Sequence, residues 1–355
     1  MEELLQEFLK PRSTLALLGV IAVSLFALGK FADLVVDYAV VLSEQSGIPK
    51  VVIGATVVSL GTTAPEVAVS VLAAFNGHPG LAMGNAVGSI ICDTGLILGI
   101  ACLIRPLTIP WDIASRQGWV QLVSGVLLVF LSIPWNAPLS PYTDGAEGNF
   151  PQWAGFLFLG LLAIYLWISV KWSISSTTDA DETTLISEGE DSDEEVSASA
   201  PVLIVKIVLS LAGVILSANL LIPAVMIVAR RLNIPESIIA ATLVAFGTSL
   251  PELVTAVQAA RKGHGDLAVG NIIGADILNA LFVAGAAAAM TPGGLTVAHS
   301  FFWPGFPAML FVLVVFRIGI YVCRTQLTRN FGFVLLAAYF AYLGVSIAVG
   351  VNPGH

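Results

Sequence analysis

Long apolar stretches alternate with short polar breaks along almost the whole chain. A helix needs roughly 20 predominantly apolar residues to cross a bilayer. Ten stretches have this character, near residues 13–42, 48–75, 81–103, 118–135, 152–171, 202–229, 236–260, 267–291, 300–322 and 330–350. The pattern predicts ten transmembrane helices in an all-α polytopic membrane protein. The composition agrees, because 57% of the residues are hydrophobic and 11% are charged, far from the values of soluble domains.

One long polar segment interrupts this pattern near the middle of the chain. Between Ser175 and Ser199 there are nine acidic residues and no basic one, which accounts for the net charge of -9. Low hydrophobicity and a high density of like charge predict disorder. We therefore expect residues 175–200 to form a disordered linker between two five-helix halves, residues 1–174 and 201–355.

The two halves contain an internal repeat. Residues 54–99 align without a gap on residues 240–285, at a constant offset of 186, and 19 of the 46 positions are identical. The copies are separated by an odd number of predicted spans, so they enter the membrane in opposite directions. This is the inverted-repeat organisation of secondary transporters.

The basic residues predict the orientation of the chain. With the linker in the cytoplasm, ten bases lie on the inside against four outside. Such a bias predicts a cytoplasmic linker and both termini outside. We expect a multi-pass protein of the cell membrane whose surroundings are the lipid bilayer, with no nucleic-acid partner and no obligate protein partner.

Two hexapeptides place polar residues and a proline inside predicted spans. GTTAPE, residues 61–66, and GTSLPE, residues 247–252, stand at equivalent positions of the two repeats. Glu66 and Glu252 lie about fifteen residues into their spans, near the middle of the bilayer at about 1.5 Å of rise per residue. A carboxylate at this depth costs several kcal/mol unless it is paired or solvated, which indicates a function.

The prolines explain how an ion site is built on these helices. Pro65 and Pro251 each remove a backbone donor and clash with the carbonyl four residues earlier. The freed carbonyls are then available to line a cavity or coordinate an ion. Neutral hydroxyl oxygens stand on the same turns, at Thr62, Thr63, Thr248 and Ser249. Ca²⁺ takes about six to eight oxygen ligands, so we predict that each hexapeptide is half of a divalent-cation site.

A second motif follows each hexapeptide at a fixed distance. It reads GNAVGSIICD at residues 84–93 and GNIIGADILN at residues 270–279. Residues four apart share a helix face, so we expect Ser89, Asp93, Asp276 and Asn279 to contribute to the same site. For the glycines and the leading asparagines of this motif, close helix packing explains the pattern at least as well as ion binding.

Together the motifs resemble the two alpha repeats of the sodium/calcium exchangers, within the cation/calcium exchanger superfamily. The resemblance covers both repeats, the ten-span layout and the central linker. It implies that Glu66 and Glu252 bind Ca²⁺ together with the carbonyls of Thr62 and Thr248. It also implies Na⁺ sites that use the following side chains: Thr63, Ser249, Ser89, Asp93 and Asn279.

The resemblance further implies a minimal, prokaryote-type antiporter. Such a protein exchanges Na⁺ for Ca²⁺ by alternating access, driven by the sodium gradient and electrogenic, with the first helix of each half as a sliding gate. The transported ions would be Na⁺ and Ca²⁺, with no cofactor. We expect no enzymatic activity, because the chain has no phosphate-binding loop and no soluble domain for ATP chemistry.

Three departures from the family pattern leave the coupling ion open. Ala275 stands where a serine is expected, and Asp276 replaces a residue that is often Asn. Asp93 and Asn279 exchange the residue types that many relatives carry in the two halves. The potassium-dependent branch has Asp at the position of Asn279, and Asp93 at the mirror position could restore that charge. Exchange coupled to K⁺ or H⁺ is therefore the alternative, although proton-coupled relatives usually carry an acid where Gly88 stands.

A calcium-selective channel is the alternative of a different class. Channels need weak, multi-ion binding along an open path and usually a ring of subunits. Two inverted half-sites in one chain favour a carrier that occludes its ions.

Overall fold

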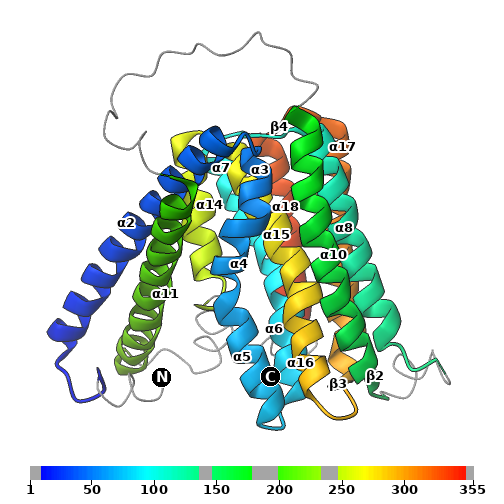
Figure 1. Ribbon diagram of the computed structural model, residues 1–355. Helices are drawn as coiled ribbons and strands as arrows, with labels where there is room; N and C mark the ends of the chain where they lie inside the picture. The colour runs from blue at the N-terminus through cyan, green and yellow to red at the C-terminus, as the bar shows by residue number, and fades with distance from the viewer. Residues whose placement is uncertain (1–8, 136–145, 178–198, 233–246, 349–355) are drawn as a thin grey trace.

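The computed structural model describes residues 9–135, 146–177, 199–232 and 247–348. Within these ranges the protein is helical apart from short strands (Figure 1). The predicted linker lies almost entirely outside the described residues, as does the first half of the predicted span at 236–260. The prediction of a disordered linker therefore stays a prediction.

In the described residues of the first half, the helices are separated by four short π-helical or strand segments. Its elements are α2 (Thr14–Ser46), α3 (Lys50–Ile53), η1 (Gly54–Val58), α4 (Ser59–Thr62), α5 (Ala64–Phe75), α6 (Pro79–Ile91), η2 (Cys92–Ile97), α7 (Leu98–Ile104), β1 (Leu107–Thr108), α8 (Trp111–Ser132), β2 (Gly148–Phe150) and α10 (Gln152–Thr177). The second half has a similar order. Its elements are α11 (Ala200–Arg231), α14 (Leu250–Lys262), α15 (Gly265–Leu278), η4 (Asn279–Ala284), α16 (Gly285–Met290), β3 (Leu295–Val297), η5 (Phe301–Gly305), α17 (Phe306–Cys323), β4 (Gln326–Leu327) and α18 (Arg329–Ala348).

The helices confirm an integral membrane protein with many spans. In the described part of the chain, eight helices are long and apolar enough to cross a membrane. A ninth span is the bent pair Lys50–Thr62 and Ala64–Phe75. Of the predicted span at 236–260, the structure describes the second part, which is α14.

The two repeats form the same elements in opposite directions. Helices α5 and α14 begin 186 residues apart, at Ala64 and Leu250, and so do α6 and α15, at Pro79 and Gly265. We call the side on which α10 ends and α11 begins the linker side, and the side on which α2 begins the terminal side. From the middle of the molecule, α5 runs to the terminal side and α14 to the linker side (Figure 1). The structure thus has the inverted repeat that the sequence predicts.

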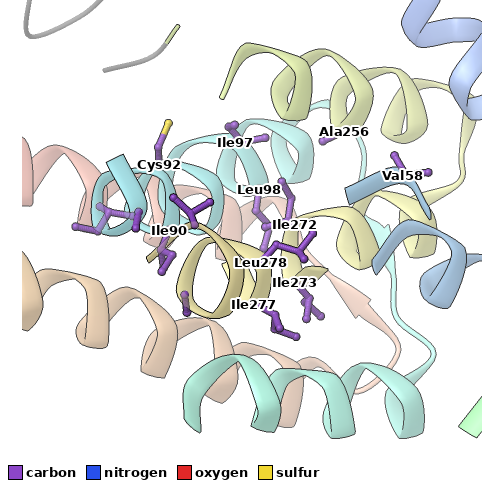
Figure 2. Close-up of a cluster of buried hydrophobic side chains, with 14 of the residues drawn as sticks. Val58, Ile90, Cys92, Ile97, Leu98, Ala256, Ile272, Ile273, Ile277 and Leu278 are labelled. Carbon is purple, nitrogen blue, oxygen red and sulfur yellow. The ribbon is translucent and has the colours of Figure 1, made fainter. Parts of the chain in front are cut away.

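The core lies where the second motif helices of the two repeats meet. Figure 2 shows Ile90 and Leu98 of the first repeat near Ile272 and Leu278 of the second. All four side chains are buried. In the most apolar 18-residue stretch of the span from Gly265 to Met290, 94% of the residues are buried, so this span is the central helix of the described bundle.

Two small ladders connect the halves at the two ends of the bundle. On the linker side β1 pairs antiparallel with β4, and on the terminal side β2 pairs antiparallel with β3 (Figure 1). Helices α2 and α11 pack along each other and lean away from the rest of the bundle. The fold therefore consists of a tied central bundle and one helix pair at its edge.

Glycines allow the central helix to approach the broken helix of the other repeat. A methyl group on Gly274 would lie 2.5 Å from the Cα of Ala55 in η1 and 2.5 Å from the hydroxyl of Ser59. Its repeat mate, Gly88, has no atom within 4 Å of the same position. The small-residue spacing of the motif thus serves close packing in one repeat and leaves space in the other.

We expect Gly274→Ala to destabilise the protein by about 1 to 3 kcal/mol, because the overpacked backbones must move apart. The measurement is thermal unfolding of the purified protein in detergent. Gly88→Ala is the matched control and should leave the melting temperature unchanged or slightly higher. Equal losses in both variants would contradict the packing argument.

Candidate ion-binding site

The first hexapeptide lies at a break between two helices. Helix α4 ends at Thr62 and α5 begins at Ala64, and their axes differ by 45°. Pro65 occupies the first turn of α5, where a proline needs no hydrogen-bond donor. Glu66 is in the same turn and is completely buried. The break that the proline predicts is therefore present and presents a carboxylate inside the bundle.

The second hexapeptide has the same local form where the structure describes it. Helix α14 begins at Leu250, with Pro251 and Glu252 in its first turn. Glu252 is completely buried, like its repeat mate. Each carboxylate thus stands at the start of a helix, where the partial positive charge of the helix end partly offsets its own charge.

Hydrogen bonds join each hexapeptide to the second motif of the opposite repeat. The Thr62 hydroxyl donates to Asn271 Oδ1 at 3.5 Å, and the Thr248 hydroxyl donates to Asn85 Oδ1 at 3.2 Å. These two pairs are related by the offset of 186 in both partners. From the sequence, the leading asparagines could serve either helix packing or ion binding. The two hydrogen bonds show that they hold the broken helices in place.

Further contacts between the repeats involve the residues that the sequence predicts for the site. The Thr63 hydroxyl donates to Glu252 Oε1 at 3.2 Å, and the Ser249 and Ser89 hydroxyls lie 3.4 Å apart. Asn279 Nδ2 donates to Asp93 Oδ2 at 3.4 Å. Asp93 and Asn279 are repeat mates, so this bond lies across the pseudo-two-fold axis.

The carboxylates form one electrostatic group. Glu66, Asp93, Glu252 and Asp276 are all buried, so their negative charges repel one another through a medium of low dielectric constant. Six buried side-chain oxygens of this region have no hydrogen-bond partner: Glu66 Oε1, Glu66 Oε2, Asp93 Oδ1, Glu252 Oε2, Asp276 Oδ1 and Asn279 Oδ1. Buried acceptors are normally satisfied, and hard cations bind such oxygens. The donor set therefore fits a cation.

Acidic side chains do not complete a cation site by themselves. Within the described ranges, no three His, Cys, Asp or Glu side chains stand together closely enough to hold one metal ion. Hydroxyl or carbonyl oxygens must complete the coordination. The threonines and serines of the hexapeptides are placed for this, because Thr62, Thr63 and Ser249 are buried beside the carboxylates.

A pocket gives access to this region from one side. It has a volume of about 150 Å³ and lies between α11 and the starts of α5 and α14. Pro65, Thr248 and Pro251 line it at the level of the hexapeptides. Val69 lies further along α5, which runs to the terminal side, so the pocket extends toward that side.

Asp276 has a separate set of partners that the motifs do not contain. Its Oδ2 accepts hydrogen bonds from the Thr94 hydroxyl and, at 2.5 Å, from Gln121 Nε2. Gln121 lies on α8, outside both repeats, and is buried. Sequence reasoning missed it, although two glutamines one turn apart in an apolar span, Gln117 and Gln121, were a signal.

Comparison with known proteins agrees with this geometry. A family model described as sodium/calcium exchanger protein matches residues 16–171 and 202–348. The chain belongs to the sodium/calcium exchanger family. This is a family of membrane transporters and not of enzymes; its members exchange Na⁺ and Ca²⁺ and use no cofactor.

Relatives of the exchanger match over nearly their whole length. The inner membrane protein YrbG of Escherichia coli strain K12 is 33% identical over 315 residues, which are 88% of this chain and 91% of YrbG. The sodium/calcium exchanger MaX1 of Methanosarcina acetivorans is 30% identical over 92% of this chain and 97% of MaX1. The solved structure of the sodium-calcium exchanger NCX_Mj, soaked with 2.5 mM Na⁺ and 10 mM Sr²⁺, superposes with a TM-score of 0.74 at 25% identity, over 95% of this chain and 99% of that one.

The contact between Gln121 and Asp276 predicts a difference between two glutamines of α8. Gln121→Leu should destabilise the exchanger by about 1.5 to 3 kcal/mol, because a buried carboxylate loses a donor. Gln117→Leu should be neutral or stabilising, because both polar atoms of Gln117 are buried without a hydrogen-bond partner. Thermal unfolding of the two variants in detergent compares them directly, and a larger loss for Gln117→Leu would refute the assignment.

Proposed function

We propose that this exchanger moves several Na⁺ ions against one Ca²⁺ ion, driven by the sodium gradient, by alternating access. The observation that carries the proposal is the convergence of the two hexapeptides, one from each repeat, on a group of buried carboxylates with unpartnered oxygens. The group can bind either several Na⁺ ions or one Ca²⁺ ion, and its negative charge cannot stay unneutralised in the membrane. Competition for the same carboxylates then makes exchange obligatory.

In this proposal Glu66 and Glu252 are the central Ca²⁺ ligands. The carbonyls of Thr62 and Thr248 complete the Ca²⁺ site. Na⁺ sites around it use the hydroxyls of Thr63, Ser249 and Ser89, the carboxylate of Asp93 and the carboxamide of Asn279. Hydrogen bonds between the repeats support this set. Thr63 donates to Glu252, the Ser249 and Ser89 hydroxyls contact each other, and Asn279 donates to Asp93. All of these side chains are buried.

Asp276 adds a carboxylate to this set. Its Oδ2 is held by Thr94 and Gln121, whereas its Oδ1 is buried without a partner. Asp93 and Glu252 are buried like Asp276, so the three negative charges oppose one another. We assign to Asp276 a bound cation or proton, and coupling to K⁺ or H⁺ would enter here only if that ion left in one state of the cycle.

The helix pair α2 and α11 is the gate in this mechanism. On the linker side, Lys262 at the end of α14 binds Asp37 of α2 at 2.7 Å and Asp33 at 3.3 Å. Its ammonium also donates to the carbonyl of Asp33 at 3.2 Å. These contacts hold α2 against the bundle on the linker side, while the pocket beside the hexapeptides extends to the terminal side. The structure thus suits a state with access from the terminal side.

We place the linker in the cytoplasm and both termini outside the cell membrane. The bases of the described chain gather on the linker side, among them Lys50, Arg105, Arg261 and Lys262, and Arg231 lies on the terminal side. This distribution follows the positive-inside rule. In that orientation the pocket faces the outside of the cell.

The first test is Ca²⁺ uptake into proteoliposomes that are loaded with Na⁺ and diluted into Na⁺-free medium, with and without K⁺. We expect uptake that requires the Na⁺ gradient, is unaffected by K⁺ and is lost in Glu66→Gln and in Glu252→Gln. Glu44→Gln is the matched control, because Glu44 is an exposed carboxylate paired with Lys50 at 3.4 Å. Uptake that ignores Na⁺ and follows a K⁺ or H⁺ gradient would overturn the choice of coupling ion.

The second test concerns the gate. Lys262→Gln should speed amide hydrogen exchange in the linker-side half of α2, because a partly exposed ammonium with two carboxylates contributes roughly 0.5 to 1 kcal/mol. Hydrogen exchange followed by mass spectrometry measures this in the reconstituted protein. Arg261→Gln removes the same charge from the neighbouring exposed position and should leave the exchange unchanged. Identical exchange in both variants would exclude Lys262 as a latch.

A further inference from the structure

The inverted repeat relates the two sides of the exchanger residue by residue. Helices α2 and α11 are repeat mates, because they begin at Thr14 and Ala200, 186 residues apart. The same offset relates α5 to α14. In transporters of this architecture, access alternates as one part of the protein moves against the other. The contact of α2 with α14 on the linker side therefore corresponds to a contact of α11 with α5 on the terminal side.

On the linker side, α2 is closed against α14. Lys262 forms ion pairs with Asp37 at 2.7 Å and with Asp33 at 3.3 Å. One turn earlier on α14, Gln258 Nε2 donates a hydrogen bond to the carbonyl of Gly29 at 3.3 Å. Two successive turns of α14 are thus joined to α2, one of them through an ammonium and two carboxylates.

On the terminal side, a pocket takes the place of this contact. The repeat mates of the three α2 residues are Ile215, Asn219 and Pro223 of α11, and all three line the pocket beside the hexapeptides. The repeat mates of the two α14 residues are Leu72 and Asn76, at and just after the end of α5, and both are exposed. Within the described ranges, no hydrogen bond or ion pair joins Leu72 or Asn76 to α11. The terminal side is therefore open at the positions where the linker side is closed.

Closure of the two sides involves different chemistry. On the linker side an ammonium meets two carboxylates, and charged groups form hydrogen bonds about twice as strong as those of neutral groups. On the terminal side, closure brings the carboxamide of Asn76 toward that of Asn219, and Pro223 offers no side-chain donor or acceptor. An ion pair between partly exposed side chains, like that of Lys262, shifts an equilibrium by a factor of roughly two to five. The repeat mates cannot supply this factor.

We propose that Lys262, Asp33 and Asp37 determine which side the exchanger favours, and that they favour access from the terminal side. They are positioning residues, because they hold the gate and take no part in the ion site. The inference rests on the alternating access of the proposed function and adds an unequal population of its two orientations. Ions that arrive from the linker side then meet the less populated orientation, which weakens their apparent affinity.

The test reads the two sides with one cysteine on each. Val69 lines the terminal-side pocket and is 41% exposed, whereas its repeat mate Thr255 on α14 is 1% exposed. Val69→Cys and Thr255→Cys are each reacted with a water-soluble methanethiosulfonate in lipid nanodiscs, which leave both sides of the full-length protein in water. The reaction rate of the wild-type protein, with its native cysteines, is subtracted. We expect Val69→Cys to react faster than Thr255→Cys.

Removal of the linker-side ion pair should open the linker side. Lys262→Gln should raise the reaction rate of Thr255→Cys by about two- to fivefold, which is the factor that the ion pair contributes. Arg261→Gln is the matched control. It removes the same charge from the next position, which is exposed, and should leave the rate unchanged.

A second variant acts from the opposite side and separates a shift of the whole equilibrium from a local loosening of α2. Asn76→Lys with Asn219→Asp introduces on the terminal side the ion pair that is missing there. It should raise the rate of Thr255→Cys by a similar factor and lower that of Val69→Cys. Either substitution alone has no partner and should have neither effect.

The outcomes separate this inference from the function on which it rests. An unchanged rate of Thr255→Cys in Lys262→Gln would overturn the proposal, and so would a rise there that the terminal-side pair does not reproduce. If Thr255→Cys stays unreactive at every Na⁺ and Ca²⁺ concentration, alternating access fails as well. A rate that responds to these ions but not to the variants would remove only the bias.

Discussion

The structure depends on one constraint, which is that several carboxylates are buried inside a bundle of membrane-spanning helices. Glu66, Asp93, Glu252 and Asp276 are all buried, and five of their carboxylate oxygens have no hydrogen-bond partner. Such a group is stable only with cations or protons. The neighbouring elements hold these side chains in place: helix starts at the glutamates, hydroxyls on the preceding turns and asparagines from the opposite repeat. In the proposed function this keeps the carboxylates oriented for the transported cations.

The inverted repeat brings two copies of the same motifs together around one region of a single chain. Each broken helix is tied to the second motif of the other repeat, so neither half can form its part of the site alone. The symmetry is not exact, and its departures lie at the centre. Asp93 bonds to its own mate Asn279 across the axis, and Ser89 has Ala275 as its mate. Because repeat mates carry different side chains here, two positions that the pseudo-two-fold axis relates can bind different ions in the proposed function.

Much of this arrangement was predictable because its signals are local. The length of the apolar stretches predicts the spans, and a proline inside a span predicts the break before Glu66. The repeat at an offset of 186, which corresponds to an odd number of spans, predicts the inversion. Partners far apart in the sequence leave no such signal. Gln121 binds Asp276 across 155 positions, and Lys262 binds Asp37 across 225, and neither pair follows from periodicity. The π-helical segments η2 and η4 also escaped prediction, because one extra residue per turn hardly changes an apolar pattern.

The position of Asp276 bears on how much charge an exchange cycle moves. With Glu66, Asp93 and Glu252, it brings the number of buried carboxylates to four. With one Ca²⁺ bound, the four carboxylates would still carry two negative charges, so further cations or protons must neutralise the set, one of them at Asp276 in the proposed function. If that ion stays with Asp276 in both loaded states, it cancels from the exchange ratio. If it leaves in one state only, it becomes a coupled ion. The anchoring of one Asp276 oxygen by Thr94 and Gln121 favours the first case, because a carboxylate held in place keeps the same partner through the cycle.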